Sequence, residues 1–366
     1  MQRSDLFLEA QRQLEICNAC RYCEGYCAVF PALERRRSFD EGDIIYLSNL
    51  CHDCRDCYTA CMYAPPHEFK VNIPALLSEV RLGVYEDYSS PRALGRSFRQ
   101  QIASVGSIVF AALLLTVLLV VAFDGPDTIF TTHRGPGSFY IVIPYLAMFI
   151  PAMVISLLGI GTVIGGLVRY WRDTGARSGR GPNAQSFLQA TWQSLTLTFL
   201  RGGGSGCDYP GETESYSRLV FHSFVAYGFL AAFAATIAAA IEQDIFDVLP
   251  PYPILSAPVL LGIVGGIGLI VGATGLAYLK AQSTDRPAFH LMTVADYVLL
   301  VLLDLIAVTG LLLLVFRGSA AMGALLTLHV GLVLGAFLTA PYGKFVHWVY
   351  RYLALIQNRI EESAAE

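Results

Sequence analysis

Six long apolar stretches separated by short polar loops occupy most of residues 101–350 and constrain what this chain can fold into. Each stretch is long enough to cross the hydrocarbon core of a bilayer, which takes about 20 apolar residues in a helix. The sequence therefore predicts six transmembrane helices. We place them at 104–123, 139–168, 218–241, 254–279, 294–316 and 321–345.

The first 100 residues have a different composition and are rich in Arg, Glu and Asp. The whole chain is 54% hydrophobic and only 15% charged, whereas an ordinary soluble domain has about 25% charged residues. We therefore expect a soluble head (residues 1–100), a transmembrane bundle (101–350) and a tail (351–366). The net charge of −4 is mild and argues against a nucleic-acid partner.

Basic residues near the span ends predict the orientation of the bundle, because Lys and Arg are enriched in cytoplasmic loops. Five arginines lie between the second and third spans, whereas the loops of the opposite side carry only Arg134 and Arg317. The first residues also lack the apolar core of a secretory signal peptide. We therefore expect the head and both termini on the cytoplasmic side of a bacterial inner membrane.

Two copies of one cysteine motif lie in the head, "CNACRYCEGYC" from Cys17 and "CHDCRDCYTAC" from Cys51. The spacing C-x2-C-x2-C-x3-C is the ligand run of 4Fe–4S ferredoxins, in which the fourth cysteine binds the other cluster. Zinc sites use pairs of C-x2-C and have no need of eight thiolates in this pattern. The crossed assignment gives Cys17, Cys20, Cys23 and Cys61 to one cluster and Cys51, Cys54, Cys57 and Cys27 to the second.

The segment between the two runs has helical periodicity, with Asp43 as a plausible helix start. This pattern favours the helical type of ferredoxin over the β-hairpin type. The predicted fold class is therefore all-α, with a helical two-cluster ferredoxin-type head followed by a six-helix transmembrane bundle. The ninth cysteine, Cys207, has no partner in the sequence and remains unassigned.

Histidines inside membrane spans are candidates for functional sites. His222 and His347 both lie near predicted cytoplasmic span ends, and because their spans are antiparallel they should lie at similar depth. Two such imidazoles on facing helices can ligate a b-type haem. His329 lies 18 residues before His347, about 27 Å along a helix, so both cannot bind one haem.

Other assignments of these histidines stay open. His222 and His347 can instead cap helix ends or meet lipid headgroups, and His290 is a competing ligand. His329 is a candidate for a second haem toward the outer leaflet, where only His133 in the outer loop is available as a partner.

With these residues identified, the chain resembles the tricarballylate-utilization protein B family, also called the citrate-utilization protein B family. The similarity spans nearly the whole chain and includes both cysteine runs, the second extended by "MYAPPHEFKVNIP". It also includes "GGGSGCDYP", "YSRLVFH" and "APYGKFVHWVYR". Some relatives read His-His at the third-span motif, where this chain has His222 followed by Ser223. The bundle is also distantly similar to the two-haem cytochrome b subunit of respiratory nitrate reductases.

The resemblance implies electron transfer from a reduced FAD-dependent tricarballylate dehydrogenase, or a similar flavoprotein, through 4Fe–4S clusters and haem to the membrane. Quinone is the expected acceptor. No Ser/His/Asp set, phosphate loop or dinucleotide-binding fingerprint is present, so we expect no catalytic residues for substrate chemistry. The alternatives are an electron-transfer anchor for a different dehydrogenase and a redox-sensing membrane protein. A transporter is disfavoured, because internal repeats and mid-membrane basic residues are missing.

Overall fold

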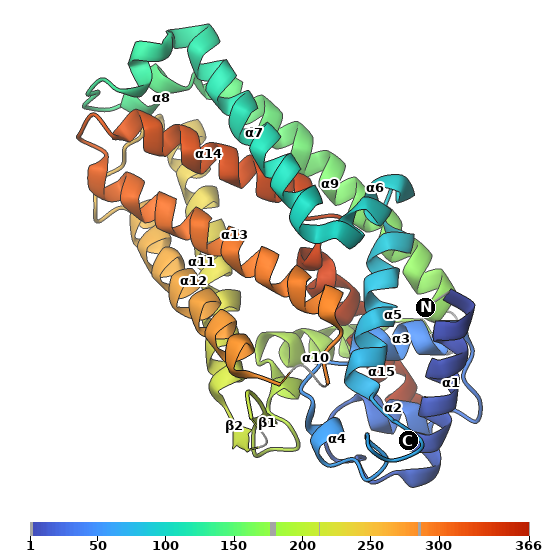
Figure 1. The fold of residues 1–366 in the computed structure, drawn as a ribbon. Coiled ribbons are helices and arrows are strands. Elements are labelled where there is room, and N and C mark those ends of the chain that lie inside the picture. The colour runs from blue at the N-terminus through green and yellow to red at the C-terminus, as the bar shows by residue number, and fades with distance from the viewer. Residues whose placement is uncertain (1–2, 176–180, 212, 285–286, 366) are drawn as a thin grey trace.

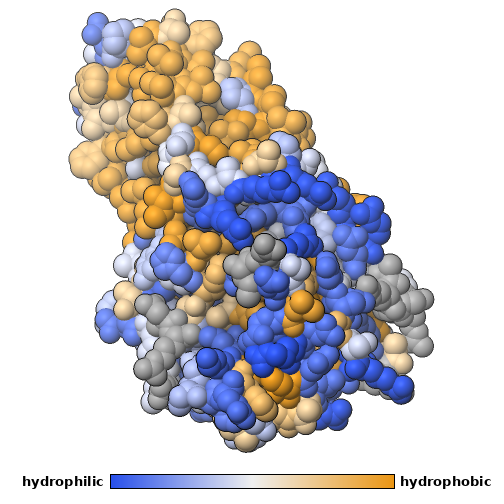
Figure 2. Space-filling view, turned by 45° about the vertical axis from the view of Figure 1, so that its right-hand side comes forward, coloured by the Kyte–Doolittle hydropathy of each residue, from blue (hydrophilic) through white to orange (hydrophobic). Residues whose placement is uncertain are grey.

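The computed structural model describes residues 3–175, 181–211, 213–284 and 287–365, and this part of the chain is almost entirely helical. Figure 1 shows long helices at one end of the molecule and a group of shorter helices, which contains both chain termini, at the other. In Figure 2 the first region is mostly hydrophobic and the second mostly hydrophilic. The predicted all-α chain with a helical head and six long apolar helices is confirmed.

Among the described residues, six helices are long and apolar enough to cross a membrane, and each overlaps one predicted span. The first combines α6 (Arg92–Ser97), η1 (Phe98–Gln100) and α7 (Gln101–Asp124). The others are α9 (Tyr145–Thr174), α11 (Ser217–Phe246), α12 (Ala257–Gln282), α13 (His290–Phe316) and α14 (Met322–Thr339).

Two of these helices differ from the predicted ranges near a proline. The second begins only at Tyr145, after Pro144, and the residues before it form the short helix α8 (Ser138–Val142). The sixth ends at Thr339, because Pro341 has no N–H to continue the helix. The predicted span 321–345 was therefore too long, and its last residues form η5 (Lys344–Val346).

Glycines allow α11 and α12 to approach each other closely. A Cβ on Gly265 would lie 2.5 Å from the backbone nitrogen of Ala232, and one on Gly272 would lie 2.6 Å from that of Val225. Small residues at such positions let membrane helices pack backbone to backbone. Further contacts join α12 to α13, α13 to α14, and α14 to both α7 and α9.

Short elements connect the spans. The segment η2 (Pro126–Ile129) follows α7. Between α9 and α11 lie α10 (Ala184–Leu195), η4 (Thr198–Leu200) and a hairpin of two strands, β1 (Cys207–Asp208) and β2 (Glu214–Ser215), paired antiparallel.

The head is built from α1 (Arg3–Cys20), α2 (Val29–Glu34), α3 (Glu41–Leu50), α4 (Asp56–Thr59) and α5 (Ile73–Tyr88). Its third helix begins at Glu41, slightly before the expected start at Asp43. Asp40 is the N-cap and accepts a bond from the Asp43 amide, while the Asp43 carboxylate accepts one from the Asp40 amide. This reciprocal capping box satisfies two backbone donors that a helix start leaves unpaired.

Residues 351–366, predicted as a tail, lie almost wholly in helix α15 (His347–Ala365), which packs into the head. Leu355 and Ile356 are each 1% exposed and belong to the same apolar core as α1, α3 and α5. An ion pair also joins α15 to the head, since Arg36 Nη2 lies 2.8 Å from Glu361 Oε1. The last helix is thus a structural part of the head.

We expect Leu355→Ala to lower the free energy of unfolding by about 2–5 kcal/mol, because it leaves a cavity in this core. Leu8→Ala is the matched control, since Leu8 is 66% exposed on α1 of the same head. Urea unfolding followed by tryptophan fluorescence measures both, as Trp171 lies against this core. Equal effects of the two variants would show that α15 is not part of the core.

Candidate functional site

The first cysteine group lies where α1 ends. Cys17 and Cys20 stand in its last turn, and Arg21, with a left-handed φ of 57°, turns the chain so that Cys23 follows at once. Cys61 comes from the second run and lines the same small cavity as these three cysteines. The structure therefore brings one cysteine of the second run to the first group, as the crossed assignment requires.

The second cysteine group forms around the loop between α3 and α4. Cys51 caps the end of α3, and Asp53 and Arg55, both with left-handed φ, wind the loop on which Cys54 stands. Cys27 of the first run lies close enough to Cys51 and Cys57 for the thiolate charges to interact. Cys57 also lines the cavity of the first group, so the two groups adjoin there.

These donors fit iron–sulfur clusters better than single metal ions. All nine cysteines are free thiols. In the part of the chain that the structure describes, no three His, Cys, Asp or Glu side chains are close enough together to hold one ion. A 4Fe–4S cluster binds its four thiolates at separate iron atoms, so it suits a wider spacing.

Burial of the thiols affects how a cluster can be loaded. It raises the pKa of Cys17 and Cys23 to about 12, with neighbouring cysteines adding to the effect. Because only the thiolate binds metal, cluster binding must displace protons from these groups. The positive charge of iron then stabilises thiolates that burial alone disfavours.

Three arginines from distant parts of the chain, one buried and two half-buried, hold the second cysteine loop. Arg81 of α5 donates to the carbonyl oxygens of Ser48 and Cys51, each at 2.7 Å. Arg351 of α15 donates to the same Cys51 oxygen at 2.9 Å. Arg218 of α11 donates to the carbonyl of the next residue, His52, at 2.8 Å.

This arginine clamp (Arg81, Arg218 and Arg351) places positive charge beside the second cysteine group. Burial, together with nearby Arg81, lowers the pKa of Arg351 to about 10. Buried cations that repel one another are stabilised by an anion nearby. A 4Fe–4S cluster with four thiolate ligands carries net negative charge and supplies such an anion.

The glycine-rich segment before β1 brings Cys207 to the second group. Gly206 has a φ of 106°, and a Cβ there would lie 2.7 Å from the backbone of Ser215. The Asp208 amide donates to Asp56 Oδ1 at 2.8 Å, which ties the hairpin to α4. Cys207 is fully buried, its thiol donates to the Leu200 carbonyl at 3.2 Å, and it packs in one buried cluster with Cys54.

Sequence reasoning left Cys207 unassigned, and only its glycine-rich setting hinted at a tight backbone approach.

We expect Cys207→Ala to retain about eight irons per chain, because each cluster already has four cysteines. It should change the paramagnetic signal of the second cluster alone, through the lost contact with Cys54. Cys54→Ala is the comparison and should lose about half of the iron. Loss of half the iron in Cys207→Ala would instead make Cys207 a ligand.

The structure brings His222 and His347 together. Their ring centres are 6.5 Å apart, with the planes at 82°. Two imidazoles that share one metal, each about 2 Å from it through nitrogen, have ring centres about 6 Å apart. His347 Nδ1 lies 2.8 Å from the Lys344 carbonyl oxygen, so it carries the proton and leaves Nε2 free to bind.

His347 is not on the sixth span, as the sequence had suggested, but is the first residue of α15. It still faces α11, because the turn after Thr339 leads the chain back across the end of the bundle. Together with His222 it lines a cavity of about 120 Å³ whose other lining residues include the arginine clamp, Lys280 and Lys344. The two histidines would serve as axial ligands of a haem and the arginine clamp as basic partners of its carboxylates, whereas Lys280 and Lys344 are already paired with Asp296 of the same cavity, at 2.9 and 3.0 Å.

His329 lies apart from this pair. Its Nδ1 is 3.1 Å from Thr309 Oγ1, and it lines a separate apolar cavity of about 190 Å³. Among the described residues no second histidine lines that cavity. His133 bonds locally to Thr131 and Thr128, so the structure gives His329 no imidazole partner.

Comparison with known proteins gives matches over most of the chain. Residues 99–366 match the family model of citrate utilization protein B, and residues 10–87 match that of its Fer4-like domain. The chain is 40% identical over 357 residues to citrate utilization protein B of Escherichia coli, covering 97% of this chain and 92% of the relative. No solved structure matches the chain.

The predicted resemblance is therefore confirmed, and the head is a Fer4-like, iron–sulfur type of domain joined to a multi-pass membrane bundle. Together, the two family matches cover most of the chain. The chain belongs to the citrate utilization protein B family.

Proposed function

We propose that this protein carries electrons from a reduced flavoprotein, through two 4Fe–4S clusters and a haem b held by His222 and His347, to quinone in the membrane. The observation that carries the proposal is the order of the sites in space. The first cysteine group adjoins the second at Cys57. Arg81 and Arg351 bond to Cys51 of the second group and also line the histidine cavity.

The redox groups supply one-electron steps between a two-electron flavin and a two-electron quinone. The chain's own residues fix their positions. The arginine clamp holds the Cys51 carbonyl in the second cysteine loop, and the Lys344 carbonyl orients His347. In both contacts the acceptor is a backbone oxygen, so the main chain fixes where the acceptor lies.

The outer face of the first cysteine group is the proposed entry point for electrons. Cys20 and Cys23 stand beside Tyr22 and Met62, which are 59% and 60% exposed. An exposed aromatic and a flexible thioether suit a transient contact with a partner protein. We propose an FAD-dependent dehydrogenase of a tricarboxylate such as tricarballylate as that partner.

The experiment mixes purified dehydrogenase and tricarballylate with anaerobic membranes that contain the protein. We expect a b-type haem band to appear on reduction, and Cys51→Ala to prevent it while dithionite still reduces the haem. If dithionite produces the band but the dehydrogenase does not, the partner is a different dehydrogenase. If dithionite produces no band, the haem proposal is wrong.

The proposed direction of electron flow requires the head to face the cytoplasm. We expect reporter fusions at Arg201, before β1, and after Ala365 to read as cytoplasmic, and a fusion at Asp247 to read as external. The positive-inside distribution of arginines is the physical reason. An external reading at Arg201 would place the cysteine groups away from any cytoplasmic flavoprotein.

A further inference from the structure

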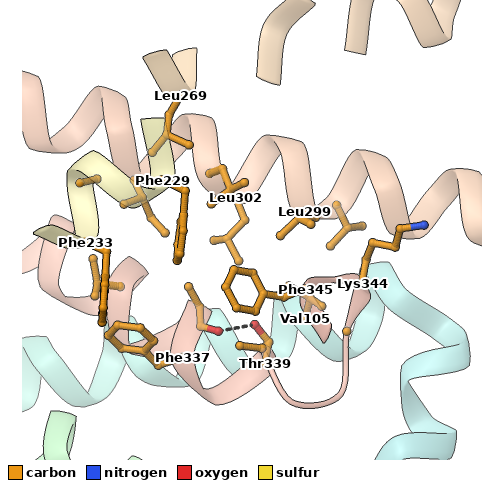
Figure 3. Close-up of a pocket in the computed structure, with 18 of the residues that line it drawn as sticks. Val105, Phe229, Phe233, Leu269, Leu299, Leu302, Phe337, Thr339, Lys344 and Phe345 are labelled. Atoms are coloured by element: carbon orange, nitrogen blue, oxygen red, sulfur yellow. Dashed lines mark hydrogen bonds between the residues drawn. The ribbon is translucent and has the colours of Figure 1, made fainter. Parts of the chain in front are cut away.

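The apolar cavity that His329 lines has no role in the sites described so far. It lies between α7, α11, α13 and α14 and has a volume of about 190 Å³. Figure 3 shows the rings of Phe229, Phe337 and Phe345 standing around it. The Phe229 and Phe345 rings are 5.2 Å apart at 61°. Such a wall suits a flat ring that stacks on aromatic side chains.

One end of this cavity is polar. Gln101, the first residue of α7, is only 3% exposed and lines it. Lys344 and Thr339 line it too, but Lys344 Nζ is paired with Asp296 at 3.0 Å and Thr339 Oγ1 donates to the Gly335 carbonyl at 2.9 Å. No described residue forms a hydrogen bond with the Gln101 side chain. Because a buried amide without a partner is costly, this side chain points to a ligand that supplies hydrogen-bonding atoms.

The cavity is next to the histidine cavity. Leu299, Leu303 and Lys344 line both of them. A ligand beside Gln101 is therefore separated from the space between His222 and His347 by a single layer of side chains. That is the position required of a group that exchanges electrons with the histidine site.

The same cavity has a wall toward the surrounding lipid. Phe233 of α11 lines it and is 47% exposed on the bundle. Its ring thus lies both in the wall of the cavity and on the outer surface of α11. A ligand with an apolar tail can therefore enter sideways from the bilayer and leave its tail there.

We propose that this cavity binds the ring of a lipid-soluble quinone, with the Gln101 amide donating a hydrogen bond to a ring carbonyl. The inference rests on the proposed function and locates its acceptor site. The quinone takes up two electrons, one at a time, from the histidine site. It also takes up two protons from water at the head end of the bundle, and so leaves as quinol.

The test uses full-length protein in lipid nanodiscs, reduced with dithionite and freed of the excess. Decylubiquinone and a short-chain naphthoquinone are then added while the haem band is followed. We expect Gln101→Leu to raise the half-saturating quinone concentration about tenfold, because the quinone loses one hydrogen bond. Gln100→Leu is the matched control, since this neighbouring glutamine is exposed and does not line the cavity; it should behave like the wild type.

A second variant, Val333→Phe, fills the cavity and should slow reoxidation at all quinone concentrations while leaving the haem band unchanged. A wild type without a haem band contradicts the proposed function itself. A haem band that quinones reoxidise equally in all variants overturns only the cavity assignment. The assignment also fails if the protein holds two haems and His329→Ala removes one of them, because the cavity would then contain a haem.

Discussion

Replacing Cys61 with alanine should remove the cluster of the first cysteine run and leave that of the second, although Cys61 belongs to the second run in sequence. In the structure Cys61 lines the cavity of Cys17, Cys20 and Cys23. Cys27→Ala should have the converse effect, because Cys27 lies with Cys51 and Cys57. We expect iron to fall from about eight to about four per chain in each variant.

Low-temperature paramagnetic resonance distinguishes the two losses, since the variants should each retain a different cluster signal. Cys207→Ala is the control for the mere loss of a buried thiol and should keep both signals. If Cys61→Ala removes the same signal as Cys54→Ala, each run holds its own cluster and the crossed assignment is wrong.

The second large effect is expected at the histidine pair. His222→Ala and His347→Ala should each abolish the b-type band in reduced-minus-oxidised spectra of membranes. Each removes one of two rings whose centres lie 6.5 Å apart, so an intact pair of axial ligands no longer exists. The paramagnetic signals of the clusters should persist, because neither histidine is among the eight assigned cysteine ligands.

His329→Ala is the matched control for this pair. His329 is also a buried histidine near a cavity, but its Nδ1 lies beside Thr309 rather than a second imidazole. The band should therefore remain at full intensity. A band lost in His329→Ala and kept in His347→Ala would place the haem in the apolar cavity instead.

The parts of the fold that local sequence determines were predictable. Apolar runs located all six spans, and cysteine spacing indicated the Fer4-like head. Two helices fall short of the predicted spans, at Tyr145 and at Thr339, and both do so where a proline interrupts an apolar run. Hydropathy alone does not detect such an interruption.

The parts that depend on distant contacts were not predictable. Arg81, Arg218 and Arg351 converge on one loop from α5, α11 and α15, and no spacing in the sequence relates them. The contact of Cys207 with Cys54 likewise joins residues from separate regions. The pairing of His222 with His347 was anticipated, although His347 belongs to α15 rather than to the sixth span.

The position of α15 has a consequence for how this protein is made. The core that surrounds α1, α3 and α5 includes Leu355 and Ile356, which the ribosome adds only after all six spans. The head therefore cannot finish packing co-translationally, even though its own helices emerge first. Arg351, which holds the second cysteine loop, also arrives late. We therefore expect the second cysteine group to take its final shape only after the bundle has been inserted into the membrane.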